Sequence, residues 1–297
     1  MKFRPAFALL LFLPAIFLAC AGKGFDFGEG STFLWKVSDA DSHVWILGSI
    51  HYADESFYPL AEPIEAAFEA SVAVAAELDV SDEAVREESV DEFSSRCCLA
   101  GGETLEGMLG DSLWARFEKV AAGLGMPAKG FTTFRPWFAA MALSGMAFQK
   151  SGLDPLLGID FVLLDRARDE GKEIIELETP AEQASALAPD TSDEEGVRYL
   201  KETLDEIETL DSLLQGLMTA WKTGDIAGFR EFISAEDSGE MDRRLYEDRN
   251  FKMASQVERF LSENREVFVI VGAAHLVVRE DNVLSILRRR GYSVERK

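Results

Sequence analysis

Two apolar segments at opposite ends of the chain have the same form, and they limit the folds that it can adopt. Residues 44–52 read VWILGSIHY, and residues 267–277 read VFVIVGAAHLV. Each is a run of β-branched and aromatic residues, typical of a buried strand, that ends at a glycine and has a histidine three residues later. If the two strands are parallel neighbours, both histidines lie at the sheet edge where open α/β folds bind ligands.

The remaining pattern places most strands near the ends of the chain and most helices in its middle. Strands are predicted at residues 32–37 and 43–50, joined as a hairpin, and at 71–80, 173–178 and 292–296. Helices are predicted from Asp111 as an N-cap to 125, and at 135–152, 191–223 and 241–264, whereas 81–110 is expected to be irregular or to form short helices. This order predicts an α/β fold with a central mixed sheet built from N- and C-terminal strands and a large helical insertion.

The N-terminus has the pattern of a bacterial lipoprotein signal. Lys2 and Arg4 precede 14 uncharged residues, too few to span a bilayer, and this run ends directly before Cys20. We therefore predict a signal peptide over residues 1–19, lipidation of Cys20, a tether over 20–31 and one folded domain over 32–297. Such a protein would be anchored in the bacterial cell envelope, on the periplasmic face of the outer membrane. An ordinary secretory signal cleaved nearby is the alternative.

The charge of the chain limits its partners. It carries 53 Asp and Glu residues against 30 Lys and Arg residues, a net charge of −23. Such acidity argues against nucleic acid as a partner, and contact with the membrane is expected only through the lipid anchor. Cys97 and Cys98 are adjacent, so a disulfide between them would be strained, and unpaired thiols are an equally good interpretation.

Three residues form the candidate site. His51 and His275 follow the two glycine-terminated strands, and Glu77 comes late in the apolar run VAVAAELDV. Two histidines and a carboxylate make a three-ligand metal set with an open position for water, and a metal there would activate that water. For either histidine alone, a hydrogen-bonded core residue is the simpler interpretation. His43 is expected to be structural, and Asp79 to cap the strand exit.

Several ordered blocks of the sequence resemble the TraB/GumN family, which is related to the TIKI proteins and, more distantly, to erythromycin-esterase and ChaN-type proteins. The resemblance covers residues 32–296. Besides the two Gly-x-x-His segments, it rests on AAELDV, FRPWFAAMAL, GIDFVLLDRARDEGKEIIELETPAEQ and YEDRNFKMA. It implies an α/β fold in which both histidines and Glu77 meet at one site that binds manganese, cobalt or zinc.

The resemblance also implies supporting residues for this site. Arg249 and Asn250 would orient a substrate carbonyl or stabilise an oxyanion, although an exposed helix face with intrahelical ion pairs is the alternative. Asp160, Glu178 and Arg135 would support the metal ligands from behind. Asp160 and Glu178 could equally be helix-cap and strand-end residues.

Two functions from different classes follow. The first is an envelope-anchored, metal-dependent hydrolase of peptidase type, similar to the TIKI proteins, acting on a peptide or small-molecule substrate. The second is a non-enzymatic lipoprotein that binds haem or another ligand, similar to ChaN-type proteins, with Trp35, Trp45 and Trp137 as candidate pocket aromatics. An interaction protein with a vestigial site is a third possibility, and the sequence leaves open whether the chain is an enzyme.

Overall fold

The computed structural model describes residues 30–188, 193–233 and 246–297. The predicted signal peptide, Cys20 and all but the last two residues of the predicted tether lie outside the described residues. None of the helices in the described ranges is both long and apolar enough to cross a membrane.

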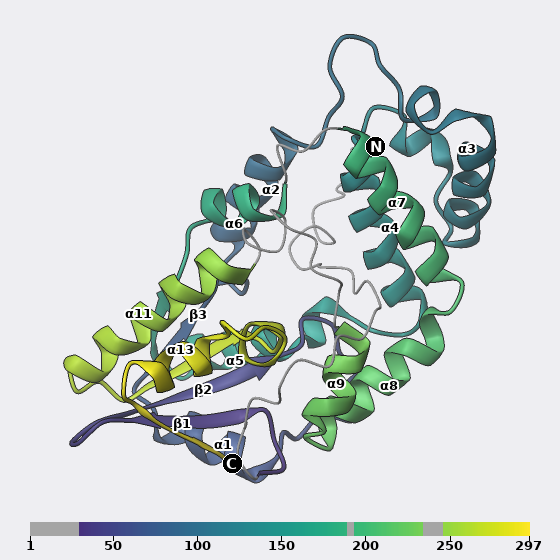
Figure 1. Ribbon diagram of the computed structural model, residues 1–297. Helices are drawn as coiled ribbons and strands as arrows, with labels where there is room; N and C mark the ends of the chain where they lie inside the picture. The colour runs from purple at the N-terminus through teal and green to yellow at the C-terminus, as the bar shows by residue number, and fades with distance from the viewer. Residues whose placement is uncertain (1–29, 189–192, 234–245) are drawn as a thin grey trace.

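A six-stranded mixed sheet forms the centre of the described residues, in the order β4-β3-β5-β2-β1-β6 (Figure 1). Its strands are β1 (Leu34–Ser38), β2 (His43–Ser49), β3 (Ala73–Ala76), β4 (Glu173–Glu176), β5 (Val267–Gly272) and β6 (Ser293–Arg296). Strand β5 pairs in parallel with β2 and β3, and β3 with β4, whereas β1 is antiparallel to both β2 and β6. The predicted α/β class, with a mixed sheet built mainly from the two ends of the chain, is confirmed.

The register of the parallel strands brings the two Gly-x-x-His segments together. Gly48 is paired with Val271, and Ser49 with Gly272, so β2 and β5 end at the same edge of the sheet. On the other side of β5, Ala76 is paired with Ile270, so β3 also ends at this edge. All three strands are almost entirely buried, as expected for parallel strands covered on both faces.

Helices cover the sheet on both faces. Helix α1 (Glu62–Ala70) packs through Phe68 against Phe268 of β5, and α5 (Ile159–Asp169) adjoins it through an ion pair between Arg166 and Glu65. On the other face, α11 (Asp248–Ser262) and α13 (Val283–Arg289) pack against each other, in front of the sheet in Figure 1.

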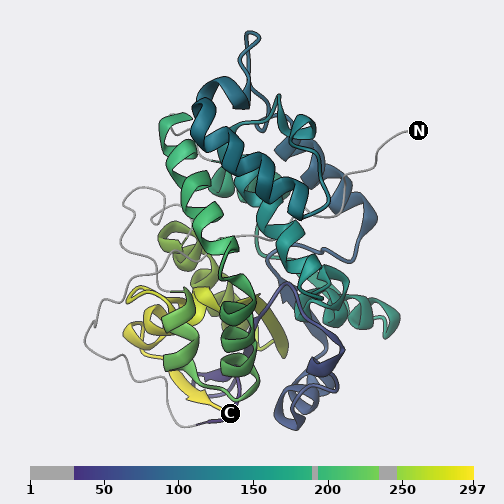
Figure 2. The same ribbon diagram turned by 90° about the vertical axis from the view of Figure 1, so that its right-hand side faces the viewer.

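The middle of the chain forms a helical layer with its own apolar core. This layer comprises α2 (Glu83–Ser94), α3 (Leu105–Gly123), α4 (Pro136–Lys150), α6 (Pro180–Leu187) and α7 (Asp193–Ile207). Phe117, Trp137 and Leu200 are among its buried residues. Figures 1 and 2 show α3, α4 and α7 standing beyond one end of the sheet, while α8 (Leu210–Lys222) and α9 (Ile226–Ile233) return the chain to it.

Some element boundaries differ from the prediction. Helix α3 begins six residues before Asp111, with Thr104 as its N-cap, and it bends at Gly110, where a positive φ of 66° interrupts the helix. The region 191–223 forms two helices, α7 and α8, and β4 ends at Glu176. The helix predicted from 241 begins at Asp248 within the described residues, and 241–245 lie outside them.

Candidate functional site

His51, Glu77 and His275 converge at the shared strand edge, around Gly272. A Cβ atom placed on Gly272 would lie 3.3 Å from Nε2 of His51, 3.4 Å from Oε1 of Glu77 and 3.8 Å from the His275 ring. The space beside this glycine is therefore bounded by all three predicted residues. A side chain at this position would press on His51 and Glu77, so the glycine keeps the point where they meet open.

His51 is held from behind by Asp160. Its Nδ1 lies 2.8 Å from Oδ2 of Asp160, in the first turn of α5. The loop that carries His51 is fixed by a hydrogen bond from the Ile159 amide to the Ile50 carbonyl, 2.9 Å long, and by the close approach of Gly158 to the His51 carbonyl. Burial disfavours the charged imidazole, but the carboxylate of Asp160 outweighs burial and raises the pKa of His51.

His275 is held in the same way by the side-chain amide of Asn250. It lies in the short helix α12 (Ala274–Val277), and its Nδ1 is 2.7 Å from Oδ1 of Asn250. The amide nitrogen of Asn250 donates to the carbonyl of Asp281, so its oxygen faces the imidazole and accepts the proton on Nδ1. Burial, with the positive charge of Arg249, lowers the pKa of His275 to about 3. The ring is therefore neutral at pH 7, with an unprotonated Nε2.

Arg249 joins Glu77 to Glu178. Its guanidinium binds Glu178 at 2.6 and 3.0 Å and Glu77 at 2.6 Å, and all three side chains are buried or nearly so. Oε1 of Glu77 also accepts the amide of Gly272 at 2.7 Å. Burial opposes ionisation of Glu77, but Arg249 and the histidines lower its pKa to about 2. Burial raises the pKa of Glu178, against the opposing effect of Arg249.

The donor set suits a divalent metal by its chemistry. Both histidines direct Nδ1 to an oxygen acceptor, the arrangement that orients metal-binding imidazoles. Nε2 of His275 lies 3.8 Å from Oε1 of Glu77, and two ligands of one tetrahedral metal are about 3.4 Å apart. Within the described ranges, however, no group of three or more His, Cys, Asp or Glu side chains has the spacing of a preformed metal site.

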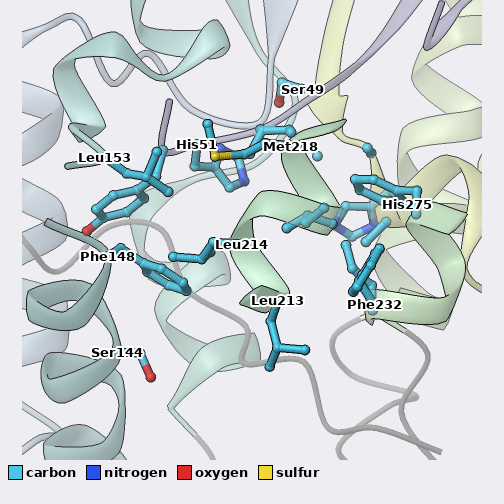
Figure 3. A pocket seen from close by; sticks show the side chains of 18 of the residues that line it. Ser49, His51, Ser144, Phe148, Leu153, Leu213, Leu214, Met218, Phe232 and His275 are labelled. Atoms are coloured by element: carbon cyan, nitrogen blue, oxygen red, sulfur yellow. The ribbon is translucent and has the colours of Figure 1, made fainter. Parts of the chain in front are cut away.

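An apolar pocket opens beside the charged residues (Figure 3). It has a cavity volume of about 190 Å³, and His51, Glu77, Arg249 and His275 form its polar end. The rest of its lining is mainly apolar and includes residues of α4, α8 and α9, among them Phe148, Leu210, Leu213, Leu214, Leu217, Met218, Phe229 and Phe232. The site thus combines a small charged centre with a much larger apolar wall.

Arg135 is the candidate site residue that does not lie with the others. It is the N-cap residue of α4, and its guanidinium pairs with Asp193 of α7 at 3.0 Å, within the helical layer and outside the pocket lining. The expectation of a supporting role beside the metal ligands is therefore corrected. The alternative interpretation of Arg249 on an exposed helix face is also wrong, because Arg249 is 9% exposed. Lys252, which the alternative pairs with Glu247 or Asp248 along the helix, forms its ion pair with Glu182.

The three candidate pocket tryptophans and Asp79 have structural positions outside the site. Trp35 and Trp137 are buried in the sheet core and the helical core, and Trp45 makes a T-shaped contact with His43 outside the pocket. Asp79 accepts hydrogen bonds from the amide and hydroxyl of Ser81, just after β3, as expected of a residue that caps a strand exit.

Comparison with known proteins identifies the family. The family model of the TraB/PrgY/gumN family matches residues 33–296, almost all of the folded part of the chain. The chain belongs to the TraB/PrgY/gumN family. The resemblance inferred from the sequence blocks is thereby confirmed.

Two curated relatives are similar over most of their length. Both carry the name "Uncharacterized protein YbaP", one from Escherichia coli (strain K12) and one from Shigella flexneri. Each is 28% identical over 266 residues, which cover 88% of this chain and 95% of the relative. No solved structure matches the chain significantly.

Sequence reasoning missed the apolar wall and the role of Gln183. Gln183 donates to Glu178 at 3.2 Å and lines the pocket. The wall was signalled by apolar residues at 210, 213, 214, 217 and 218, an i, i+3, i+4, i+7, i+8 stripe. That stripe predicts an amphipathic helix, but not that it would face a cavity beside the histidines.

Proposed function

We propose that this TraB/PrgY/gumN family member is a metal-dependent hydrolase of amide bonds, peptidase-like in the bonds that it cleaves. The observation that carries the proposal is the convergence on Gly272 of the two imidazole rings, with Nε2 of each directed toward the centre, and of the Glu77 carboxylate, at one end of the apolar pocket. His51, His275 and Glu77 would hold the metal. A bound divalent metal such as manganese, cobalt or zinc supplies an activated water and polarises the substrate carbonyl.

The surrounding residues support this chemistry. Asp160 and Asn250 fix the two imidazoles so that Nε2 of each faces the centre. Arg249 holds Glu77 in its ionised form and restrains its carboxylate together with the Gly272 amide. These contacts reduce the reorganisation that a metal or a substrate would otherwise require.

Metal content and peptide cleavage test the proposal together. Wild-type protein, His51→Ala, His275→Ala and His43→Ala would be loaded with manganese, cobalt or zinc, dialysed, and measured for bound metal and for cleavage of a peptide library. Loss of both metal and cleavage is expected in the first two variants, whereas His43→Ala, the third histidine of the chain and remote from the site, should keep both. Unchanged metal and cleavage in His51→Ala and His275→Ala would overturn the proposal.

We also propose that the protein is anchored in the cell envelope by lipid on Cys20. The support is the charged start, the short apolar run and the cysteine at its end. Membrane partitioning and incorporation of labelled palmitate are expected for the wild-type chain and not for Cys20→Ser. A Cys20→Ser protein that still carries label would contradict the anchor at this residue.

The alternative of a haem-binding lipoprotein has less support from the site. The three tryptophans considered as pocket aromatics do not line the pocket, and a carboxylate lies beside Nε2 of His275. A visible absorption band on adding haem to wild-type protein, lost in His51→Ala and His275→Ala, would favour this alternative over hydrolysis.

A further inference from the structure

Cys97 and Cys98 place two thiols side by side, away from the candidate site. Their Sγ atoms are 3.6 Å apart, and both are free cysteines. Consecutive side chains of an extended segment point to opposite sides. Here the chain bends at Cys97, just after α2, and this bend brings the two sulfur atoms together. The pair is therefore held by the backbone and not by a bond between the sulfurs.

The two thiols differ in their surroundings. Cys97 is 4% exposed and belongs to the apolar core of the helical layer, where its Sγ lies 3.5 Å from the carbonyl oxygen of Ser94. Cys98 is exposed. Burial, together with the neighbouring Cys98, raises the pKa of Cys97 to about 12, so this thiol keeps its proton at pH 7. A ligand from solvent therefore meets Cys98 first and reaches Cys97 through it.

Backbone hydrogen bonds on both sides of the pair hold the peptide group between the cysteines. The amide of Arg135, the N-cap residue of α4, donates to the carbonyl of Cys97 at 2.7 Å. Two residues further along, the amide of Leu99 donates to the carbonyl of Thr133 at 2.8 Å. Any change that turns the peptide between the cysteines must break the bond from Arg135, at the start of α4.

The distance between the sulfur atoms favours a shared ligand over a disulfide. A disulfide bond is about 2.0 Å long, so the sulfurs would have to approach by about 1.6 Å. The two Cα atoms are only about 3.8 Å apart across a trans peptide, below the usual disulfide range, so closure would also turn that peptide. Two thiolates on one soft centre, with bonds of about 2.3 Å at a tetrahedral angle, are about 3.8 Å apart. The observed separation is within about 0.2 Å of this value.

The number of sulfur ligands indicates which soft centre suits the pair. Within the described ranges, no group of three or more His, Cys, Asp or Glu side chains is placed to hold a metal ion. A structural zinc ion takes four protein ligands, so two cysteines would leave half of its coordination unfilled. Trivalent arsenic that carries one organic group has only two positions left for ligands, and it is as soft as the thiolates that it binds.

We propose that Cys97 and Cys98 form a chelating site for soft centres that need two thiolates, of which trivalent organic arsenicals are the representative class. Each As–OH bond is replaced by an As–S bond, and the thiol proton leaves with the hydroxyl group as water. Arsenic stays trivalent, so no oxidant is needed, and Cys97 can react from its protonated form. The site lies in the helical layer and is independent of the proposed hydrolase.

Titration with phenylarsine oxide tests the site. The full chain, freed of reductant, would be titrated, treated with iodoacetamide and digested with trypsin. Residues 97–116 form one tryptic peptide, which contains both cysteines and no third one. We expect one arsenical for each chain, no alkylation of this peptide while the arsenical is bound, and recovery of both thiols after 2,3-dimercaptopropanol is added.

A variant with one sulfur provides the comparison. Cys98→Ser changes an exposed side chain and should weaken arsenical binding at least about hundredfold, because the second As–S bond in wild type forms within one molecule. Ser95→Ala, at an exposed serine in the same turn, should bind as wild type does. Amide exchange followed by NMR adds a second readout. The amide of Arg135 should stay protected on binding, because chelation leaves the peptide between the cysteines in place.

The results divide into those that support the site and those that overturn it. One arsenical for each chain that protects both cysteines, lost in Cys98→Ser, would support it. Equal binding by wild type and Cys98→Ser, chains linked in pairs by the arsenical, or no binding while both thiols are free would overturn it. A 97–116 peptide that has lost two hydrogens before any arsenical is added would also overturn it, in favour of a disulfide between the two cysteines.

Discussion

Replacing Arg249 by methionine tests the network at the centre of the site. Arg249 is the cation that Glu77 and Glu178 share at 2.6 Å, and the side chains of the two carboxylates are 11% and 3% exposed. Arg249→Met keeps the apolar stem but leaves two neighbouring buried carboxylates. Breaking a buried ion pair by removing one partner costs about 3–5 kcal/mol. Against the opposing effect of burial, the pKa of Glu77 is lowered to about 2 from an ordinary value of 4.5, chiefly by Arg249, with smaller contributions from His275, His51 and the Gly272 amide.

Urea unfolding of metal-free protein in chelator measures this cost. At pH 7 we expect Arg249→Met to lose about 3–5 kcal/mol in free energy of unfolding, which is a fall in Tm of roughly 8 °C. Glu77 has a depressed folded pKa, so its contribution is present above pH 4.5 and is lost as the pH falls toward 2. The difference between wild type and variant should therefore shrink below pH 4.5.

Two further variants make this result decisive. Adding Glu178→Gln to Arg249→Met should restore part of the lost stability, because one buried charge is removed. Arg289→Met is the control, since Arg289 is 53% exposed and pairs with Asp281, which is 45% exposed, so the expected loss is under about 1 kcal/mol. If the free energy of unfolding of Arg249→Met at pH 7 is within about 1 kcal/mol of the wild-type value, the three groups do not form the coupled network described above.

Three other substitutions test separate parts of the structure. Asn250→Leu removes the acceptor of the His275 Nδ1 proton, so metal affinity measured by competition with a chelating dye should fall about 10–100-fold. Burial raises the pKa of Glu206 to about 8, so ionisation of this residue costs the folded state stability as the pH rises from 4.5 to 8. In urea unfolding, Glu206→Gln should therefore be more stable than wild type by about 2 kcal/mol at pH 8 but not at pH 4. Gly158→Ala would place a Cβ atom 2.3 Å from the His51 carbonyl oxygen, so the loop must move, and metal binding should weaken at least tenfold with a measurable fall in Tm.

Each of these substitutions has a matched control in the chain. His43→Ala should leave metal affinity unchanged, since its ring packs against Trp45 away from the site. Glu118→Gln, at an exposed position of α3, should not alter the pH dependence of stability. Gly123→Ala should not affect metal binding, because a Cβ atom there meets nothing within 4 Å. A Glu206→Gln protein with the same pH profile as wild type would contradict the burial argument.

The sheet could be predicted from the sequence because its strands carry local signals. The β-branched runs that end at Gly48 and Gly272 gave the strand positions and suggested parallel pairing, which is observed. Helix boundaries were harder to predict from the sequence. Thr104 and Gly110 together decide where α3 begins and bends, and the bend depends on tertiary packing that spacing alone does not show.

The site was partly predictable, because strand ends reveal which residues meet but not how they are paired. His51, Glu77 and His275 could be placed at one edge from their positions after buried strands. The partners of Arg249 could not, because its contacts to Glu77 and Glu178 are 172 and 71 residues distant in the chain. A family block indicated Arg135 equally well, yet this arginine pairs with Asp193 of α7, away from the site.

The position of β5 has a consequence for how the protein is made. This strand lies between β2 and β3 and is almost the last element of the chain, so until residue 272 has been synthesised the strands on either side of it have no common neighbour. The pairs β1–β2 and β3–β4 are therefore joined only when β5 is added, and the edge strand β6 follows it. Until residue 272 has been made, the growing chain leaves the facing edges of β2 and β3 unpaired, although β2 can already pair with β1 and β3 with β4, and such open strand edges favour aggregation.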